Sequence, residues 1–249
     1  MPAQPLIEAA GLDLGYGGGP PAVTGVSFAL AAGERLALLG PNGGGKTTIL
    51  RAILGELRPL AGGLRVSASC GTVPQTERSR LDYPVSALEV ATMGSLSRLP
   101  WWRRPGRAER DSARRALERV GMGDLADATF GELSGGQRQR AFIAMVLAQD
   151  TQYLLLDEPL NNLDMKHSVE MMRLLRRLAD EFGKTIVLVV HDINFASCYS
   201  DTILAMKDGR LVHQGSPRLI MQQAMLRDVY DIDIRIEDID GNRIGVYFA

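Results

Sequence analysis

The sequence predicts an α/β fold with parallel strands at its centre, because short apolar segments alternate with segments of helical periodicity. Three of the apolar segments have the length and composition of buried strands: Arg35–Leu39, Tyr153–Leu156 and Ile186–Val190. Gly40 follows the first segment, Asp157 the second and His191 the third. Ligand sites in open parallel sheets lie at the carboxyl ends of the strands. We therefore expect the functional residues at these three strand ends.

A glycine-rich loop joins the first strand to a predicted helix. Its eight residues are Gly40, Pro41, Asn42, Gly43, Gly44, Gly45, Lys46 and Thr47. The glycines allow successive backbone N–H groups to converge on phosphate oxygens, and the helix that follows adds the positive end of its dipole. Lys46 is expected near the β- and γ-phosphates, and the Thr47 hydroxyl suits Mg²⁺. The order strand, loop, helix favours a nucleotide site, extending to Thr48, over a chance glycine-rich turn.

Two carboxylates follow the second strand, and a proline then ends it. Asp157 is suited to hold Mg²⁺, and Glu158 to orient and deprotonate an attacking water. An acidic exit from a strand is a common structural feature, but it is an unlikely explanation in a chain that also has a phosphate loop. After the third strand, a neutral His191 imidazole is placed to donate a hydrogen bond to a γ-phosphate oxygen.

A second candidate anion site is the segment Leu133–Gln137, which precedes a strong helix former over Gln137–Leu147. Ser134 offers a hydroxyl, and Gly135 and Gly136 allow close approach of the backbone. A loop followed by a helix N-terminus is suited to anions. Taken alone, however, the same residues are also typical of an ordinary helix cap.

Taken together and in order, these segments resemble the nucleotide-binding subunits of ATP-binding cassette (ABC) transporters, from about residue 6 to 215. Gly40–Thr47 resemble the Walker A loop, Tyr153–Pro159 Walker B, and Leu133–Gln137 the ABC signature. Val73–Gln75 resemble the Q-loop, Asn161–Asp164 the D-loop, and His191 the switch histidine. The D-loop begins Asn-Asn here, where the family usually has Ser-Ala, which is a departure from the family pattern.

The resemblance implies ATP and Mg²⁺ as cofactors and assigns the site residues. The catalytic residues are Glu158, His191 and Gln75. The Mg²⁺ ligands are Thr47, Gln75 and Asp157. The remaining nucleotide contacts are Tyr16, residues 40–48, Ser134, Gly135, Gly136, Gln137 and Asp164. Tyr16 stands where the family has an aromatic that stacks on adenine. Because a flexible glycine-rich stretch follows it, an ordinary surface tyrosine is the alternative.

The resemblance also implies the domain plan: one ABC ATPase domain over 1–249, with a P-loop NTPase core, an N-terminal antiparallel β subdomain and a helical lobe that carries the signature. The catalytic core is expected at 1–75 and 141–215, the helical subdomain at 76–140, and a short tail at 216–249. Two copies are expected to face head to tail, so that ATP on Lys46 and Thr47 of one copy is capped by Ser134 and Gly136 of the other.

The cargo is less well defined, because different parts of the chain resemble different branches of the family. Asp157–Ser168, His191–Asp201 and the tail are similar to ferric-siderophore importers, whereas Cys70–Gln75 and Tyr83–Gly94 are more similar to manganese and zinc importers. Nineteen of the 27 glycines lie before residue 125, a shift that fits either ordinary drift or two related sequences joined. The first expectation is an importer ATPase for an iron–siderophore or other metal chelate, and the alternative is a manganese or zinc importer.

An alternative hypothesis of a different functional class is that the chain is a soluble ABC ATPase, such as the iron–sulfur assembly ATPase. Its signature resembles Phe-Ser-Gly-Gly-Glu, which differs from the segment found here. ABC proteins of DNA repair or translation carry two cassettes or long insertions, and this chain has neither.

Composition limits the partners and the compartment. The net charge is −1 over 249 residues, which gives no support to a nucleic-acid partner. No apolar run approaches the roughly 18–20 residues that span a bilayer, no signal peptide opens the chain, and two cysteines make no disulfide framework. We expect a peripheral protein on the cytoplasmic face of the membrane, bound to permease subunits and served indirectly by a substrate-binding protein.

Other segments have local predictions. Leu12–Leu14 and Val26–Leu30 alternate as strands do, residues 203–206 and 210–213 flank a hairpin turn at Asp208-Gly209, and residues 108–120 form a charged helix with one apolar side. The helix after Asp164 is expected to bury Met171, Leu174, Leu175, Leu178 and Phe182. Trp101 and Trp102, followed by two arginines, are candidates for contact with a partner or with lipid headgroups; an ordinary loop that packs its tryptophans is the alternative.

Overall fold

A computed structural model of the chain describes residues 5–67, 70–73, 84–161 and 163–247. Gln75 and Asn162, both part of the predicted site, lie outside the described residues. The chain divides into two compact units: Met1–Ala68 with Arg176–Ala249, and Ser69–Leu175.

The first unit contains four strands in the order β7 (Thr185–Val189), β3 (Arg35–Leu39), β8 (Thr202–Lys207), β9 (Arg210–Gly215). β3 runs parallel to both of its neighbours, and β9 pairs antiparallel with β8. The predicted hairpin at Asp208-Gly209 is therefore confirmed, and both turn residues have positive φ, at 49° and 72°. The centres of β3, β7 and β8 are buried on both faces, as parallel strands generally are.

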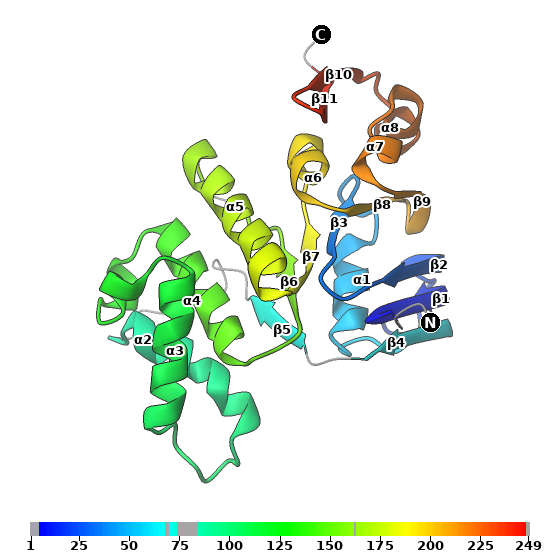
Figure 1. Cartoon of the computed structure of the whole chain (residues 1–249). Helices are drawn as coiled ribbons and strands as arrows, with labels where there is room; N and C mark the ends of the chain where they lie inside the picture. Colours follow the sequence, from blue (N-terminus) through cyan, green and yellow to red (C-terminus); the bar gives the residue numbers. More distant parts are fainter. Residues whose placement is uncertain (1–4, 68–69, 74–83, 162, 248–249) are drawn as a thin grey trace. The chain divides into compact units, whose positions relative to one another are not determined.

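A second sheet in this unit is antiparallel, with the order β2 (Val23–Leu30), β1 (Ile7–Leu14), β4 (Ala61–Val66). It is the expected N-terminal β subdomain. Figure 1 shows these strands beside α1 (Lys46–Ile53), the helix that follows the phosphate loop. Buried and exposed residues largely alternate along β1 and β2, which agrees with a sheet that has one apolar face.

The C-terminal part of the first unit contains α6 (Ile193–Tyr199), α7 (Pro217–Ile220), α8 (Gln223–Tyr230) and a hairpin of β10 (Arg235–Ile239) and β11 (Asn242–Val246). The hairpin packs against α6 (Figure 1). This tail is therefore part of the folded unit and lies close to the end of β7.

An ion pair fixes the start of β3 against the start of β8. Arg35 donates from Nε to Asp201 Oδ2 at 2.9 Å and from Nη2 to Asp201 Oδ1 at 2.7 Å. Burial alone would raise the pKa of Asp201, but the hydrogen bonds from Arg35 outweigh that effect and lower it. The carboxylate therefore stays charged, and its bonds to Arg35 hold β3 and β8 in register at their starts.

The second unit contains β5 (Cys70–Val73), which runs parallel to β6 (Tyr153–Asp157), and the helices of the lobe. The lobe is formed by α2 (Ala87–Met93), η2 (Gly94–Arg98), α3 (Arg107–Arg119), η3 (Gly123–Leu125), η4 (Phe130–Glu132) and α4 (Gly135–Ala148). The apolar side predicted for the charged helix is buried, at Ala113, Ala116, Leu117 and Val120. Phe130 and Phe142 pack with ring centroids 5.2 Å apart. The expected helical lobe is present.

The long helix α5 (Met165–Phe182) begins in the second unit and ends in the first. Four of its predicted core residues are buried: Met171, Leu174, Leu175 and Leu178. The prediction for Phe182 was wrong, since its side chain is 38% exposed. Phe182 is the last residue of the helix, where the chain turns into Gly183 and the helical spacing no longer decides burial.

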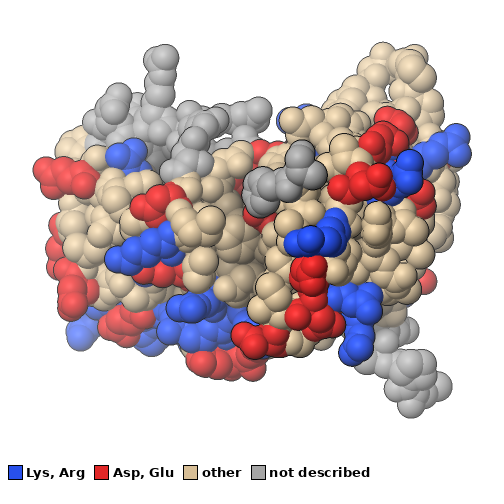
Figure 2. All heavy atoms as spheres, turned by 90° about the horizontal axis from the view of Figure 1, so that it is seen from above, with Lys and Arg blue, Asp and Glu red and all other residues tan. Residues whose placement is uncertain are grey.

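The charged surface agrees with the nearly neutral composition. On the face that Figure 2 shows, basic and acidic side chains lie close together.

Trp101 and Trp102 are 92% and 72% exposed and contact each other edge to face. Within the described ranges, no helix is both long and apolar enough to cross a bilayer.

Candidate nucleotide site

The phosphate loop leaves β3 at a position that only glycine can occupy. Gly40 has φ of 140°, and a Cβ there would lie 2.0 Å from the Met206 carbonyl oxygen of the neighbouring strand β8. Gly43 and Gly45 also have positive φ, at 80° and 96°. These glycines turn the chain back on itself before α1 begins at Lys46. The first turn of α1 has no acidic residue, so nothing there opposes the attraction of its N-terminus for an anion.

Lys46 is held inside the loop. Its side chain is 5% exposed, and Nζ donates to the carbonyl oxygens of Gly40 and Pro41, both at 2.8 Å. Two bonds to backbone atoms fix the ammonium against the loop at the start of α1. A buried and oriented positive charge there interacts with phosphate more strongly than a mobile, solvated one would.

Tyr16 is connected to the same helix. Its hydroxyl and the Thr48 hydroxyl lie 3.2 Å apart, and the Arg51 guanidinium carbon lies 5.9 Å from the centre of its ring. The tyrosine is 46% exposed. An exposed aromatic ring, attached to the phosphate-loop helix through its hydroxyl, is suited to stack on a planar base.

His191 lies one residue beyond Val190, whose N–H donates to the Leu38 carbonyl oxygen at 3.2 Å. The histidine therefore follows β7 at the edge where β3 enters the phosphate loop, since the two strands are parallel neighbours. The next residue, Asp192, caps α6 by accepting hydrogen bonds from Asn194 N and Phe195 N. The histidine is exposed, held between a buried strand and a capped helix.

In the second unit, β6 ends at Asp157, and Glu158 adopts a left-handed backbone with φ of 52°. Both carboxylates are half-buried, and Pro159 is buried behind them. Asn161 Nδ2 donates to Glu158 Oε2. The amide of the predicted D-loop therefore orients the carboxylate that is predicted to activate water. This contact was not predicted from the sequence.

The signature segment caps α4. Ser134 Oγ accepts from Gln137 N at 3.3 Å, and Gln137 Oε1 accepts from Ser134 N at 2.8 Å. This reciprocal pair is a capping box. Ser134 and Gly135 remain exposed. The geometry is therefore compatible with a helix cap and also with the predicted anion site.

The signature also contacts the D-loop, through His167. A Cβ on Gly136 would lie 3.3 Å from the His167 ring, and His167 Nδ1 lies 2.7 Å from Asp164 Oδ1. The Asp164 carboxylate also accepts from His167 N at 2.8 Å. These hydrogen bonds, the backbone one first, lower the pKa of Asp164. This connection was not predicted from the sequence, because Gly136 and His167 lie far apart along the chain.

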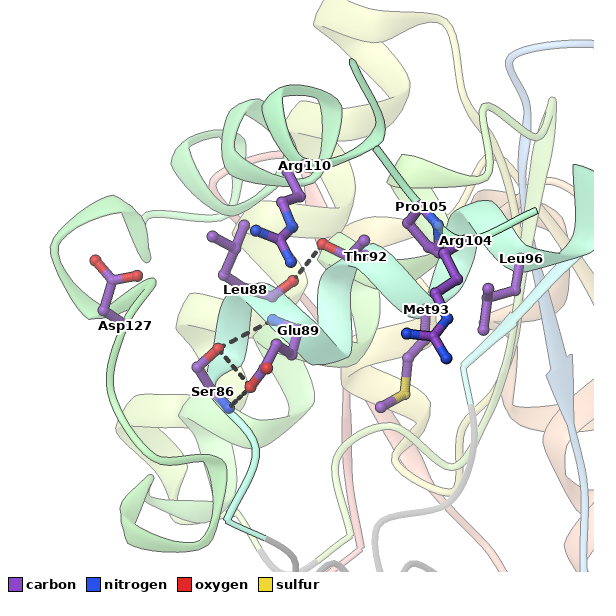
Figure 3. Close-up of a pocket in the computed structure, with 10 residues that line it drawn as sticks. All are labelled: Ser86, Leu88, Glu89, Thr92, Met93, Leu96, Arg104, Pro105, Arg110 and Asp127. Atoms are coloured by element: carbon purple, nitrogen blue, oxygen red, sulfur yellow. Dashed lines mark hydrogen bonds between the residues drawn. The ribbon is translucent and has the colours of Figure 1, made fainter. Parts of the chain in front are cut away.

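The helical lobe has a pocket of about 510 Å³ beside α2. Figure 3 shows its residues, with Leu88, Met93, Leu96 and Pro105 among the apolar ones and Glu89, Arg104, Arg110 and Asp127 among the charged ones. A capping box between Ser86 and Glu89 fixes the start of α2 next to it. Apolar and charged groups in one open hollow are suited to receive a segment of another protein.

The structure thus brings together the predicted residues within each unit. In the first, the phosphate loop, Thr48 and Tyr16 are connected, and His191 follows the neighbouring strand. In the second, Glu158 contacts the D-loop, and the signature contacts Asp164 through His167. No group of three or more His, Cys, Asp or Glu that could hold a metal occurs in the part of the chain that the structure describes.

These features define a class of protein. A phosphate loop between a parallel strand and a helix, together with a capped Ser-Gly-Gly helix start, is the pattern of an ATP-binding cassette. The ABC transporter family matches residues 23–161, and the chain belongs to that family. It is an ATP-binding domain with ATPase activity.

Particular relatives match over nearly the whole chain. The petrobactin import ATP-binding protein YclP of Bacillus subtilis (strain 168) is 40% identical over 257 aligned positions, which cover 98% of this chain and 100% of that protein. A transporter assigned to the metal-chelate type, solved in an inward-facing conformation, has a chain that is 27% identical, with a TM-score of 0.91 and coverage of 99% and 98%. A cassette solved as a post-hydrolysis dimer with ADP and Pi is 28% identical, with a TM-score of 0.72 and coverage of 85% and 99%. The fold is that of an ABC ATPase.

Proposed function

We propose that this chain is the ATPase subunit of an importer for an iron–siderophore or a related metal chelate. The observation that carries the proposal is the match over 98% of the chain to a protein named for petrobactin import. The similarity to a chain from a transporter of the metal-chelate type supports the same class of cargo. A manganese or zinc importer is the alternative, supported by the resemblance of residues 70–94.

The site residues act on ATP as follows. Lys46 and the N–H groups of residues 40–48 bind the phosphates, and Tyr16 stacks on adenine. Glu158 takes a proton from the attacking water, and His191 donates a hydrogen bond to the γ-phosphate. The Thr47 hydroxyl and the Asp157 carboxylate, assisted by Gln75, are hard oxygen donors of the kind that Mg²⁺ prefers. Mg²⁺ would supply charge neutralisation on the phosphates.

We infer that two copies enclose the nucleotide, as the dimeric cassette relative suggests. Ser134, Gly135, Gly136 and Gln137 of one copy contact the ATP that is bound to the other, and Asp164 lies at the same interface. The connection between Gly136, His167 and Asp164 supports this idea, because two of the segments expected at the interface are joined within one unit. Loss of the γ-phosphate then removes the contact that holds the copies together.

The chain works on the cytoplasmic face of a membrane, attached to permease subunits that a substrate-binding protein supplies with cargo. In domain terms, the catalytic core spans 1–75 and 141–215, the helical subdomain 76–140 and the tail 216–249. We place a permease contact at the pocket of Figure 3, because it combines exposed apolar groups with charges of both signs on the helical lobe.

Leu96→Asp tests this contact. Leu96 is 50% exposed and lines the pocket, so a buried charge at the interface would cost about 3 kcal/mol of binding, which is roughly a hundredfold in affinity. We expect loss of co-purification with the permease and loss of uptake, with the ATPase rate of the isolated subunit within about twofold of wild type. Leu219→Asp, at a leucine 46% exposed on α7, is the matched control. Equal co-purification of both variants would contradict the assignment.

The cargo is tested by uptake in cells with and without the gene. We expect labelled ferric siderophore, supplied as a catecholate chelate such as ferric petrobactin, to accumulate only when the gene is present, and manganese and zinc to be unaffected. A chain that carries Glu158→Gln serves as the energy-dead control. Gene-dependent uptake of free manganese or zinc, with no effect on the chelates, would favour the alternative importer. No effect on any of them would favour a soluble ABC ATPase.

A further inference from the structure

The C-terminal hairpin is bound to α6, the helix that begins two residues after His191. Asn194 Nδ2 donates to the Gly245 carbonyl oxygen at 3.2 Å, and Gly245 N donates back to Asn194 Oδ1 at 2.8 Å. Ser197 Oγ donates to the Arg243 carbonyl oxygen at 2.6 Å. Three hydrogen bonds therefore join segments that are about 50 residues apart in sequence, and all three involve the backbone of β11.

The packing around Gly245, where β11 meets α6, leaves no room for a larger residue. A Cβ on Gly245 would lie 2.3 Å from Ile193 Cδ1 and 3.0 Å from Ile234 Cγ2. Ile193 is 4% exposed and Ile234 is 2% exposed, so neither side chain can move into solvent without opening the core. The absence of a side chain at Gly245 is what lets β11 reach the start of α6.

His191 itself lines a small pocket whose other walls come mostly from the tail. The pocket has a volume of about 170 Å³ and is lined by His191, Ile193, Tyr230, Ile232, Ile234 and Tyr247. Four of these six residues belong to the final 20 residues of the chain. The Tyr230 hydroxyl is buried. Burial raises the pKa of Tyr230 far above its ordinary value, so this wall remains uncharged.

We propose that the tail, Tyr230 to Tyr247, is a positioning element for His191. It holds α6 through Ile193, Asn194 and Ser197, and it provides the apolar wall beside the imidazole. The ring is then confined in orientation on an otherwise exposed strand end. This inference rests on the proposed role of His191 toward the γ-phosphate, and it gives a function to a segment that contains none of the predicted nucleotide contacts.

Gly245→Ala is the first test, because the added methyl separates β11 from Ile193 without touching the phosphate loop. Displacement of a catalytic group by about 1 Å costs up to about a hundredfold in rate. We expect the ATPase rate of the full chain to fall about tenfold or more, with ATP affinity within about twofold of wild type. Tyr247→Ala, which removes part of the wall, should act in the same direction, and Tyr247→Phe should restore the rate because it retains the ring.

A double-mutant cycle separates positioning from general damage. In a His191→Ala chain, with the residual rate measured at high enzyme concentration, Gly245→Ala should cause no further loss. Ile239→Ala is the control on the same hairpin, since that side chain is 53% exposed, and we expect it to keep the wild-type rate. If Gly245→Ala does not fold, Tyr247→Ala and Tyr247→Phe complete the same cycle.

The possible results are distinct. Equal losses in the wild-type and His191→Ala backgrounds, or no loss in either, would overturn the positioning role while leaving the ATPase assignment intact. A full ATPase rate for His191→Ala alone would instead show that the histidine has no part in hydrolysis, and both the role of the histidine and the inference that rests on it would fail.

Discussion

Glu158→Gln should retain ATP binding, lose hydrolysis by roughly 10³-fold or more, and accumulate as an ATP-dependent dimer. The magnitude follows from the behaviour of residues that act as a unit in catalysis. Glutamine has the same shape as glutamate, and its amide oxygen can still accept the hydrogen bond that Asn161 donates. The change therefore removes the base without removing its support. Phosphate release and the molar mass in solution, each measured with ATP and magnesium, are the two measurements.

The control for this variant is Glu181→Gln, an exposed acid on α5. It should turn over ATP at the wild-type rate and show no persistent dimer. Wild-type turnover by Glu158→Gln would remove the carboxylate from the mechanism. A variant that is inactive but remains monomeric with ATP, even with its membrane subunits supplied, would instead contradict the proposal that a triphosphate holds two copies together.

Lys46→Ala should abolish ATP binding at micromolar concentrations. The side chain is buried and oriented by two carbonyl oxygens of the loop, so its loss removes a desolvated charge contact with the phosphates. Truncating one partner of such a contact costs about 2–5 kcal/mol, which corresponds to a loss of roughly 30-fold to several thousandfold in affinity. Equilibrium binding of a fluorescent ATP analogue measures this directly.

Lys184→Ala, just before β7 and outside the loop, is the matched control and should bind ATP normally. Because Lys46 also satisfies two loop carbonyls, the thermal midpoint of each variant must be compared without nucleotide. An Lys46→Ala chain that is folded and binds ATP as tightly as Lys184→Ala does would show that the loop does not use this lysine for phosphate.

The fold was predictable from sequence wherever the pattern that specifies an element lies within one continuous segment of the chain. The strand before Gly40, the helix that buries Ala113, Ala116 and Leu117, and the turn at Asp208-Gly209 are each encoded within about a dozen residues. The phosphate loop is local in the same way, because its glycines and Lys46 are consecutive. Local patterns such as these need no knowledge of what packs against them.

The contacts that were missed join residues that are distant in sequence. Nothing in the sequence around Gly136 indicates that the His167 ring packs on it. Likewise, nothing in the sequence of the tail indicates its contact with α6, because only the folded chain places Ile193 beside Gly245. Phe182 shows the opposite error, since a periodic pattern was extended one turn too far.

The backbone of Glu158 has a thermodynamic consequence. Five non-glycine residues of the described chain have positive φ, and the other four are all aspartates: Asp150, Asp208, Asp231 and Asp240. Short polar side chains tolerate that region because they can bond to nearby backbone, whereas a longer side chain incurs a penalty of about 1–2 kcal/mol. A chain selected for conformational stability alone would place glycine or asparagine at position 158. The glutamate found there leaves this segment less stable than glycine or asparagine at the same position would.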